Sequence, residues 1–325
     1  MSYKNENMKM IELHENGLDI RFRIRENGVV ELADFSSQEV KKTVMEPKED
    51  ICYPAVEIHR SGTGSLNMHA YKNNINQSSV DFVYENHELK EQDGGKELEI
   101  VMVSPEKLKA VYHMRLFDGE PAVQIWTEII NEGREDQGLS YVSSFMYQGI
   151  SRGGEKPYYK KTDIYVPFNS WCCEAQWQKY DAETLNLNGM VVDGFNHQGY
   201  GLNRYCYSGK GTWSTCEYLP MGIAEDRETG ETDIFQIESS GQWLAEYGSA
   251  QGGNLYLALS GATEQEHGWY KNLKPGESFT TVPAGAAVVK GGLNPAAAAL
   301  TRYRRKVRRP NTDDEKLNVV FNDYM

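Results

Sequence analysis

The alternation of apolar and polar residues is the feature that most limits the fold of this chain. In the segment 18–24, LDIRFRI, every second residue is apolar, and similar patterns return in 97–103, 107–117 and 121–130. A period of two residues is typical of a β-strand that buries one face. Asn27-Gly28 and Asp118-Gly119 separate such segments, and these dipeptides are typical of hairpin turns. We therefore expect an antiparallel meander in the first third of the chain.

The later sequence extends this prediction to most of the chain. Segment 151–217 is rich in Tyr, Trp, Asn and Gly, which favours long loops between short strands. Strand patterns return in 232–238, 242–248, 255–261 and 277–289. A chain of 325 residues can bury a large core without disulfide bonds. The predicted fold class is therefore all-β, a large antiparallel sandwich of two sheets.

One helix is expected near the end of the sequence, over residues 294–310. Asn294 is a favourable N-cap, Pro295 suits the first helical position, and a run of alanines follows. Arg and Lys residues crowd 302–309, and Pro310 ends the helix. We expect this basic run to pair with the acidic residues Asp313, Asp314 and Glu315.

The sequence after this helix, LNVVFND at 317–323, has the pattern of a buried strand that begins an α/β unit. In parallel barrels, functional residues follow the C-terminal ends of buried strands. Asn322 and Asp323 occupy such positions. They are therefore candidates for residues near a substrate.

Charge and cysteine content exclude several classes of function. The formal net charge is −13, which would repel a phosphate backbone, so nucleic acid is not an expected partner and a neutral ligand such as a sugar fits better. The five cysteines show neither a CxxC pair nor a His–Cys metal spacing, so we expect reduced thiols, no metal and no cofactor. No segment has the pattern of a signal peptide or a membrane span. The prediction is a soluble cytoplasmic protein without a membrane partner.

The residues of this chain do not show a catalytic motif. No GxSxG, HExxH or P-loop pattern occurs, and linear sequence cannot show whether two carboxylates face one glycosidic bond. Trp171 and Trp213 lie in turn-rich segments, where amphipathic rings could stack on a sugar. The alternative, that both fill the β core, stays open. Trp126 lies inside a strand pattern and is expected in the core.

Several segments resemble glycoside hydrolase family thirty-six, the bacterial α-galactosidases. Segment 235–248, FQIESSGQWLAEYG, resembles the family's IE-x-x-G-x-W-x-x-E pattern. Segment 255–289 resembles its last sandwich strands, AAALTRYRRK at 297–306 its linker helix, and VVFNDYM at 319–325 its first barrel strand. The resemblance covers nearly the whole chain.

This resemblance implies a division between a supporting domain and a catalytic one. The family places a β-supersandwich, also seen in galactose mutarotases, before a (β/α)8 barrel that carries the two catalytic Asp residues of a retaining hydrolase. The implied organisation is a supersandwich at 1–290, a linker helix at 291–316 and a truncated first barrel strand at 317–325. The chain would then hold no catalytic residue and be inactive alone. Implied partners are its own barrel, an α-galactoside or related oligosaccharide, and further copies in a homo-oligomer.

The resemblance also marks one loop that could approach a neighbouring active site. Family members commonly have Gly-Thr-Gly-Asp-Phe-Arg there. Gly62, Thr63 and Gly64 match this pattern, but Ser65 and Asn67 replace the Asp and the Arg. A neutral side chain forms weaker hydrogen bonds to a sugar than a charged one. We therefore treat these five residues as candidates near a substrate and leave the preference for galactose open.

Two further functions are compatible with the sequence. The chain could be a stand-alone carbohydrate-binding module, which requires an exposed aromatic surface. It could also be an epimerase of the mutarotase type, which requires a His acid and a carboxylate base in one cleft.

Overall fold

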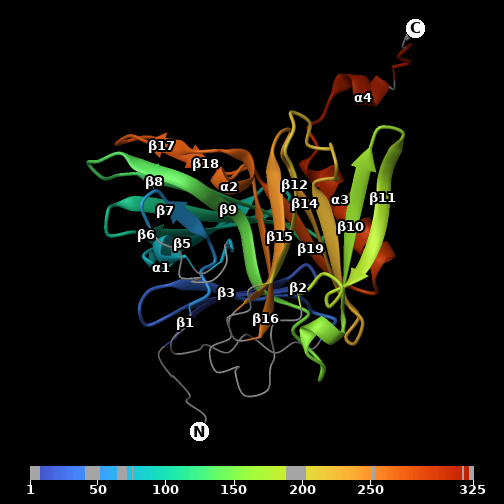
Figure 1. Ribbon diagram of the computed structural model, residues 1–325, viewed down its shortest axis with the longest axis horizontal. Helices are drawn as coiled ribbons and strands as arrows, with labels where there is room; N and C mark the ends of the chain where they lie inside the picture. The colour runs from blue at the N-terminus through green and yellow to red at the C-terminus, as the bar shows by residue number, and fades with distance from the viewer. Residues whose placement is uncertain are drawn as a thin grey trace.

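The computed structural model describes residues 8–40, 52–63, 72–74, 76–187, 203–250, 253–316 and 318–321. These residues form a β-sandwich with one long helix packed against it (Figure 1). The strands pair antiparallel throughout the described residues. The predicted all-β antiparallel fold is confirmed, and its strands divide into three sheets that enclose one main core.

The largest sheet has ten strands and forms one layer of the sandwich. Its order is β11 (Cys173–Asp181), β10 (Thr162–Ser170), β13 (Met221–Asp226), β14 (Glu231–Ile237), β19 (Ala284–Lys290), β8 (Ala122–Asn131), β7 (Leu108–Phe117), β6 (Gly95–Val103) and β5 (Val83–Gln92). The short strand β18 (Ser278–Thr280) pairs with β8 beside β19.

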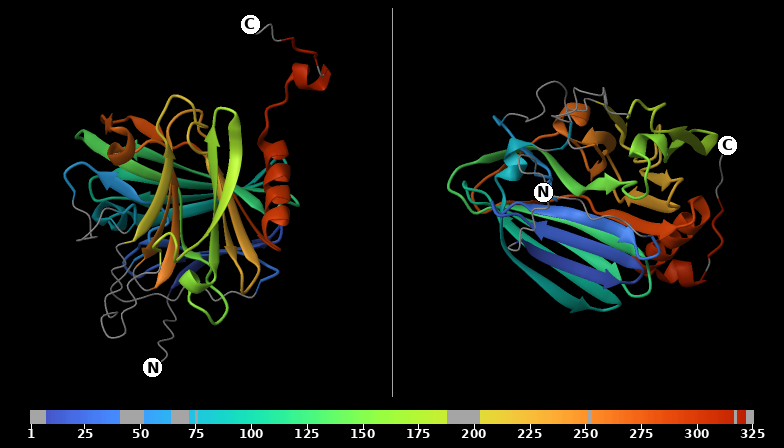
Figure 2. Two further views of the ribbon diagram at one scale, coloured as in Figure 1. Left: turned by 45° about the vertical axis from the view of Figure 1, so that its right-hand side comes forward. Right: turned by 90° about the horizontal axis from the view of Figure 1, so that it is seen from below.

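Two smaller sheets contribute to the same core from the other side. One contains β1 (Lys9–Glu15), β2 (Leu18–Ile24) and β3 (Val30–Ser37). The other has the order β12 (Arg204–Gly209), β15 (Trp243–Ala250), β16 (Asn254–Ser260), β9 (Gln137–Ile150) and β17 (Lys271–Leu273), with β4 (Ile58–Arg60) also paired to β9. Figure 2 shows the three-stranded sheet lying against the β5–β8 part of the large sheet. Ring contacts join the layers, Phe22 with Tyr112 at 5.5 Å and Phe235 with Tyr247 at 6.3 Å.

The period of two in the sequence determines which side chains enter the core. Leu98 and Ile100 of β6, Tyr112 of β7 and Ile125 of β8 are fully buried, as the alternation predicts. Trp126 follows Ile125 and therefore lies on the opposite face, where its ring stacks on His113 at 4.8 Å. The expectation that Trp126 fills the core is wrong for this reason.

The described residues also form three helices of one turn or little more and one long helix. They are α1 (Gln77–Val80), α2 (Glu264–His267), α3 (Leu293–Val307) and α4 (Thr312–Lys316), together with the 3₁₀ turn η1 (Tyr158–Lys160). The predicted helix near the end is confirmed as α3. Its buried side Ala296, Ala299, Leu300 and Tyr303 packs on the outer face of the large sheet, against residues of β13, β14 and β19.

The start of α3 and its charge pairs differ from the predictions. The N-cap is Gly292, not Asn294, and its φ of 82° is a conformation that favours glycine. Pro295 lies in the third helical position, which it tolerates because N–H groups of the first turn need no helical partner. Arg302 pairs with Glu120 of the β7–β8 turn at 2.6 Å and Arg304 with Glu238, just after β14, at 3.4 Å.

The segment after Pro310 stands away from the sandwich. Figures 1 and 2 show α4 extended beyond the body of the molecule. The side chains of Val319, Val320 and Phe321 are almost fully exposed, and no strand is assigned at 318–321. The three-part division of the chain and the barrel strand at 317–325 stay predictions.

Other expectations concern the cysteines and membranes. All five cysteines are free thiols, as predicted. Within the described part of the chain, every helix is too short or too polar to span a bilayer. Location in the cytoplasm stays a prediction.

Candidate functional site

The loop with the Gly-Thr-Gly match begins at a well-held turn. Gly62 is exposed with a φ of +80°, and Thr63 is half-buried. The Thr63 hydroxyl donates to the Arg60 carbonyl at 2.7 Å and shares a 2.6 Å hydrogen bond with the Ser78 hydroxyl. The Thr63 hydroxyl is therefore engaged in hydrogen bonds within the protein. Gly64, Ser65 and Asn67 lie outside the described residues, as do Asn322 and Asp323.

The other end of this loop is held by a buried carboxylate. Glu246 of β15 is inaccessible to solvent and accepts hydrogen bonds from the Asn73 backbone and side-chain nitrogens, both at 2.9 Å. It also accepts from Arg204 at 2.7 Å and from the Tyr256 hydroxyl. A buried carboxylate with these donors fixes Asn73 against the six-stranded sheet. Thr63 before residues 64–71 and Asn73 after them are therefore both held by hydrogen bonds.

Lys72 carries an unusual electrostatic environment beside this carboxylate. Its side chain is buried, and Nζ donates to the Ser249 carbonyl. Burial lowers the pKa of Lys72 to about 8, and the nearby Glu246 carboxylate acts in the opposite direction. The lysine is therefore easier to deprotonate than a surface lysine.

Trp171 and Trp213 do not belong to the core. Their side chains are 79% and 68% exposed, among the most exposed large apolar groups in the described residues. Trp171 lies at the β10–β11 turn, next to Cys172, whose φ is 58°. Trp213 lies in the connection between β12 and β13. The core alternative is therefore excluded for both, and stacking on a sugar stays a prediction.

The two tryptophan-bearing turns are bonded to one another. Asn169 Nδ2 donates to the Thr215 carbonyl at 2.6 Å, and the Asn169 backbone N–H donates to the Glu217 carbonyl at 2.8 Å. The buried indole of Trp243 donates to the Ser214 carbonyl at 2.7 Å. We refer to residues 168–176 and 210–218 together as the aromatic turns. Figure 1 and the left view of Figure 2 place the β10–β11 turn at the same end of the molecule as α4.

Residues of segment 235–248, which resembles the family pattern, hold α3, the second aromatic turn and Asn73 in place. Glu238 accepts a hydrogen bond from the Tyr303 hydroxyl of α3 at 2.6 Å and one from Gln124 at 2.8 Å. Trp243 holds the second aromatic turn, and Glu246 holds Asn73. The pattern is visible in the sequence, but the contacts of these residues are not. The spacing of Glu238, Trp243 and Glu246 was the only sequence feature that marked these residues. Their contacts depend on the tertiary structure.

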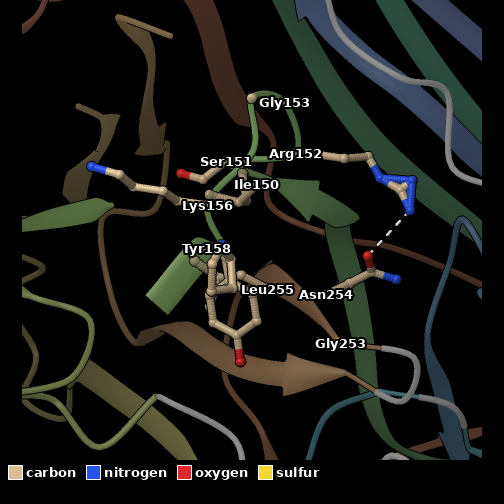
Figure 3. Close-up of a pocket in the computed structure, with 11 residues that line it drawn as sticks. Ile150, Ser151, Arg152, Gly153, Lys156, Tyr158, Gly253, Asn254 and Leu255 are labelled. Atoms are coloured by element: carbon tan, nitrogen blue, oxygen red, sulfur yellow. Dashed lines mark hydrogen bonds between the residues drawn. The ribbon is translucent and has the colours of Figure 1, made fainter. Parts of the chain in front are cut away.

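A cavity of about 300 Å³ opens at the other end of β10 from Trp171. It lies between Ile150–Tyr158 and Gly253–Leu255 (Figure 3). Arg152 donates to Asn254 Oδ1 at 3.1 Å, and Lys156 points to the opposite side. Burial lowers the pKa of Arg152. The described lining holds no His, Asp or Glu, so these residues do not supply a His–carboxylate pair.

A smaller cavity of about 220 Å³ lies beside α2 and β18. Its wall includes the rings of Trp269 and Phe279, 5.1 Å apart, and the side chain of Gln242. Its described lining also lacks a histidine or a carboxylate. The mixture of aromatic and amide groups suits binding rather than proton transfer.

One group of described residues could supply three ligands to a metal ion. Glu97, Glu99 and His113 lie on the outer face of the large sheet, away from both cavities, with their ligand atoms within 4.8 Å of one another. From the sequence no metal is expected, and His113 reads as a packed or exposed strand histidine rather than as a base. Their alternation with buried neighbours was the only signal for a shared face.

Comparison with known proteins identifies the fold. No protein-family model and no curated protein matches the chain. The GH36 α-galactosidase AgaB from Geobacillus stearothermophilus matches with a TM-score of 0.70 at 15% identity, over 96% of this chain and 44% of that chain. The α-galactosidase from Lactobacillus brevis matches with a TM-score of 0.67 at 14% identity, over 94% and 42%. The chain has the fold of one part of a GH36 α-galactosidase.

These matches confirm the resemblance at the level of the fold. The chain spans less than half the length of the α-galactosidases it matches, which agrees with the predicted N-terminal domain. Slr1438 from Synechocystis sp. PCC 6803 matches with a TM-score of 0.53 at 12% identity, over 89% of this chain and 99% of that chain. The same sandwich can therefore make up nearly an entire protein.

Proposed function

We propose that this chain is the non-catalytic N-terminal domain of an α-galactosidase-like retaining glycoside hydrolase. The observation that carries this proposal is a fold shared with less than half of each matching α-galactosidase. Among the described residues that line the two cavities there is no pair of carboxylates of the kind that glycoside hydrolysis needs. A (β/α)8 barrel would supply them. The sandwich and α3 would support that barrel and the assembly of a cytoplasmic homo-oligomer.

Two regions are proposed to contribute to a sugar site in the assembled enzyme. AgaA has been solved with raffinose and with stachyose, so oligosaccharides are ligands of a protein with this fold. The aromatic turns lie at the end of the molecule where α3 leads the chain away, and their tryptophans are exposed. Thr63 and Asn73, the described residues on either side of the candidates Gly64, Ser65 and Asn67, are each held by side-chain hydrogen bonds. Asn322 and Asp323 would face the same substrate from the barrel.

The first test is an assay of the purified 325-residue protein with a nitrophenyl α-galactoside. We expect no release of nitrophenol above the rate of buffer. Turnover that follows the protein through a second purification would contradict the proposal, because it requires a catalytic pair within these residues.

A carbohydrate-binding module is the second candidate, and the exposed tryptophans favour it. Titration of the isolated chain with raffinose or stachyose, followed by tryptophan fluorescence, tests it. If the chain binds sugar alone, Trp171→Ala and Trp213→Ala should each weaken binding by about 1 kcal/mol, or about fivefold. Tyr270→Ala is the matched control, since Tyr270 is an exposed aromatic outside the aromatic turns. Absence of binding at millimolar sugar would remove this candidate and leave the domain proposal standing.

A further inference from the structure

Three potential metal ligands share the outer face of the large sheet. Glu97 and Glu99 of β6 alternate with the buried Leu98 and Ile100, so both carboxylates point away from the core. His113 of β7 is directly opposite Glu99 in the strand register. Paired antiparallel strands hold all three backbones, so their mutual positions do not depend on a loop.

The ligand atoms of these three residues lie within 4.8 Å of one another. His113 Nδ1 lies 2.9 Å from Glu97 Oε1 and 3.8 Å from Glu99 Oε1. Zinc binds nitrogen and oxygen at about 2.0 to 2.2 Å, so tetrahedral ligand atoms lie roughly 3.3 to 3.6 Å apart. The two observed separations lie on either side of that range. Side-chain shifts of about half an ångström would therefore bring His113 Nδ1 to zinc-ligand distance from each of the two carboxylate oxygens.

Outer contacts orient each of the three ligands. Lys90 Nζ holds Glu99 Oε2 at 2.5 Å, and Gln92 Nε2 donates to Glu97 Oε2 at 2.7 Å. Both carboxylates therefore turn the other oxygen, Oε1, toward His113. The Trp126 ring stacks on the imidazole with an interplanar angle of 7°. Hydrogen bonds to ligating carboxylates, as from Lys90 and Gln92, commonly fix the ligands of metal sites.

The charges around the group also leave room for a cation. Glu97 and Glu99 carry two negative charges, and Lys90, which pairs with Glu99, supplies one positive charge. Arg115 is opposite Glu97 in the register, but its Nη2 donates to the Asp93 carbonyl and its guanidinium lies over Phe117. The chain as a whole carries a formal charge of −13, which raises the local concentration of cations.

We propose that Glu97, Glu99 and His113 bind one divalent transition-metal ion, best suited to Zn²⁺. Imidazole with two carboxylates is a donor set that zinc accepts, and three protein ligands leave a fourth position for water. The site lies on the sheet face and away from the aromatic turns and both cavities. It is therefore independent of the glycosidase proposal.

The test is isothermal titration of the full 325-residue chain with ZnCl₂, with native mass spectrometry to count bound ions. We expect the natural chain to bind one Zn²⁺. The affinity for this ion should fall at least tenfold in His113→Gln and in Glu99→Gln. His14→Gln is the matched control, because His14 pairs with Asp19 at 2.7 Å on neighbouring strands but has no third ligand within that group. It should leave the affinity unchanged. Far-UV circular dichroism checks that each variant is folded.

The exposed thiols require a separate arm of the experiment. Cys172 and Cys173 are exposed and could also bind zinc. The double variant Cys172→Ser and Cys173→Ser should retain the His113-dependent ion. Loss of zinc in this double variant, or unchanged affinity in His113→Gln and Glu99→Gln, would overturn the proposal. The three residues would then be an ion pair network of the sheet surface.

Discussion

At the scale of single residues, Glu246 shows how a motif position supports a distant loop. It is buried, and its oxygens hold Asn73, Arg204 and Tyr256. We predict that Glu246→Gln lowers the free energy of unfolding by about 3 kcal/mol, because Arg204 loses its buried partner. Urea denaturation measures this change. Glu91→Gln, with a side chain 81% exposed, is the control and should change stability by less than about 0.5 kcal/mol.

His59 gives a residue-scale prediction about pH. Burial lowers the pKa of His59 from 6.5 to about 4. Between those values the unfolded chain binds more protons than the folded one, so stability falls as the pH falls from about 6.5 to about 4. The loss for this group is about 3 kcal/mol.

Comparison with His59→Gln isolates this contribution, because carboxylates titrate in the same range. Urea denaturation at pH 7 and at pH 4 should show a smaller loss in the variant than in the natural chain. Equal losses in both proteins would mean that His59 is not responsible.

At the scale of elements, the contact between α3 and the large sheet requires a glycine. A Cβ added at Gly285 of β19 would lie 2.4 Å from the Tyr303 ring, and that ring is fully buried under α3. We predict that Gly285→Ala lowers the free energy of unfolding by about 2 kcal/mol, because the ring has no free space to enter.

The matched control for this prediction is Gly241→Ala. A Cβ at Gly241 would meet nothing within 4 Å, and its φ is not in the left-handed region. Thermal or urea unfolding of both variants gives the comparison. A loss in Gly285→Ala no larger than in Gly241→Ala would show that α3 can move away from the sheet at little cost.

At the scale of the whole molecule, the sandwich should be independent of the segment beyond α3. The described side chains at 311–313, 315–316 and 318–321 are all exposed. We predict that a chain ending at Arg309 has the same free energy of unfolding as the 325-residue chain, within about 0.5 kcal/mol. Urea denaturation of the two chains measures this. A loss above about 2 kcal/mol would mean that the segment packs on the sandwich in solution.

Much of the fold could be predicted from the sequence, because strand alternation is a local property. The pattern in 97–130 predicted β6, β7 and β8 and most of the residues that enter the core, Trp126 excepted. The run of alanines predicted α3, although its N-cap lies at Gly292. The division into three sheets was not predictable in this way, since strand pairing joins segments as distant as β8 and β19.

The candidate site was predictable only in part. Trp171 and Trp213 were selected from turn-rich segments, but their exposure depends on what neighbouring elements leave uncovered. The hydrogen bonds from Asn169 to Thr215 and Glu217 join turns more than 40 residues apart, so no local sequence pattern predicts them. The group of Glu97, Glu99 and His113 depends in the same way on the register of β6 with β7.

The sequence by itself determined the strand class, the buried faces and the final long helix, because these follow from side-chain periodicity and backbone preference within about ten residues. The tertiary structure decided which polar side chains meet. Glu246 reaches Asn73, Glu238 reaches Tyr303, and His113 reaches Glu97. Such contacts form because the core fixes sheet order and register, and only then do residues distant in sequence come within hydrogen-bonding distance.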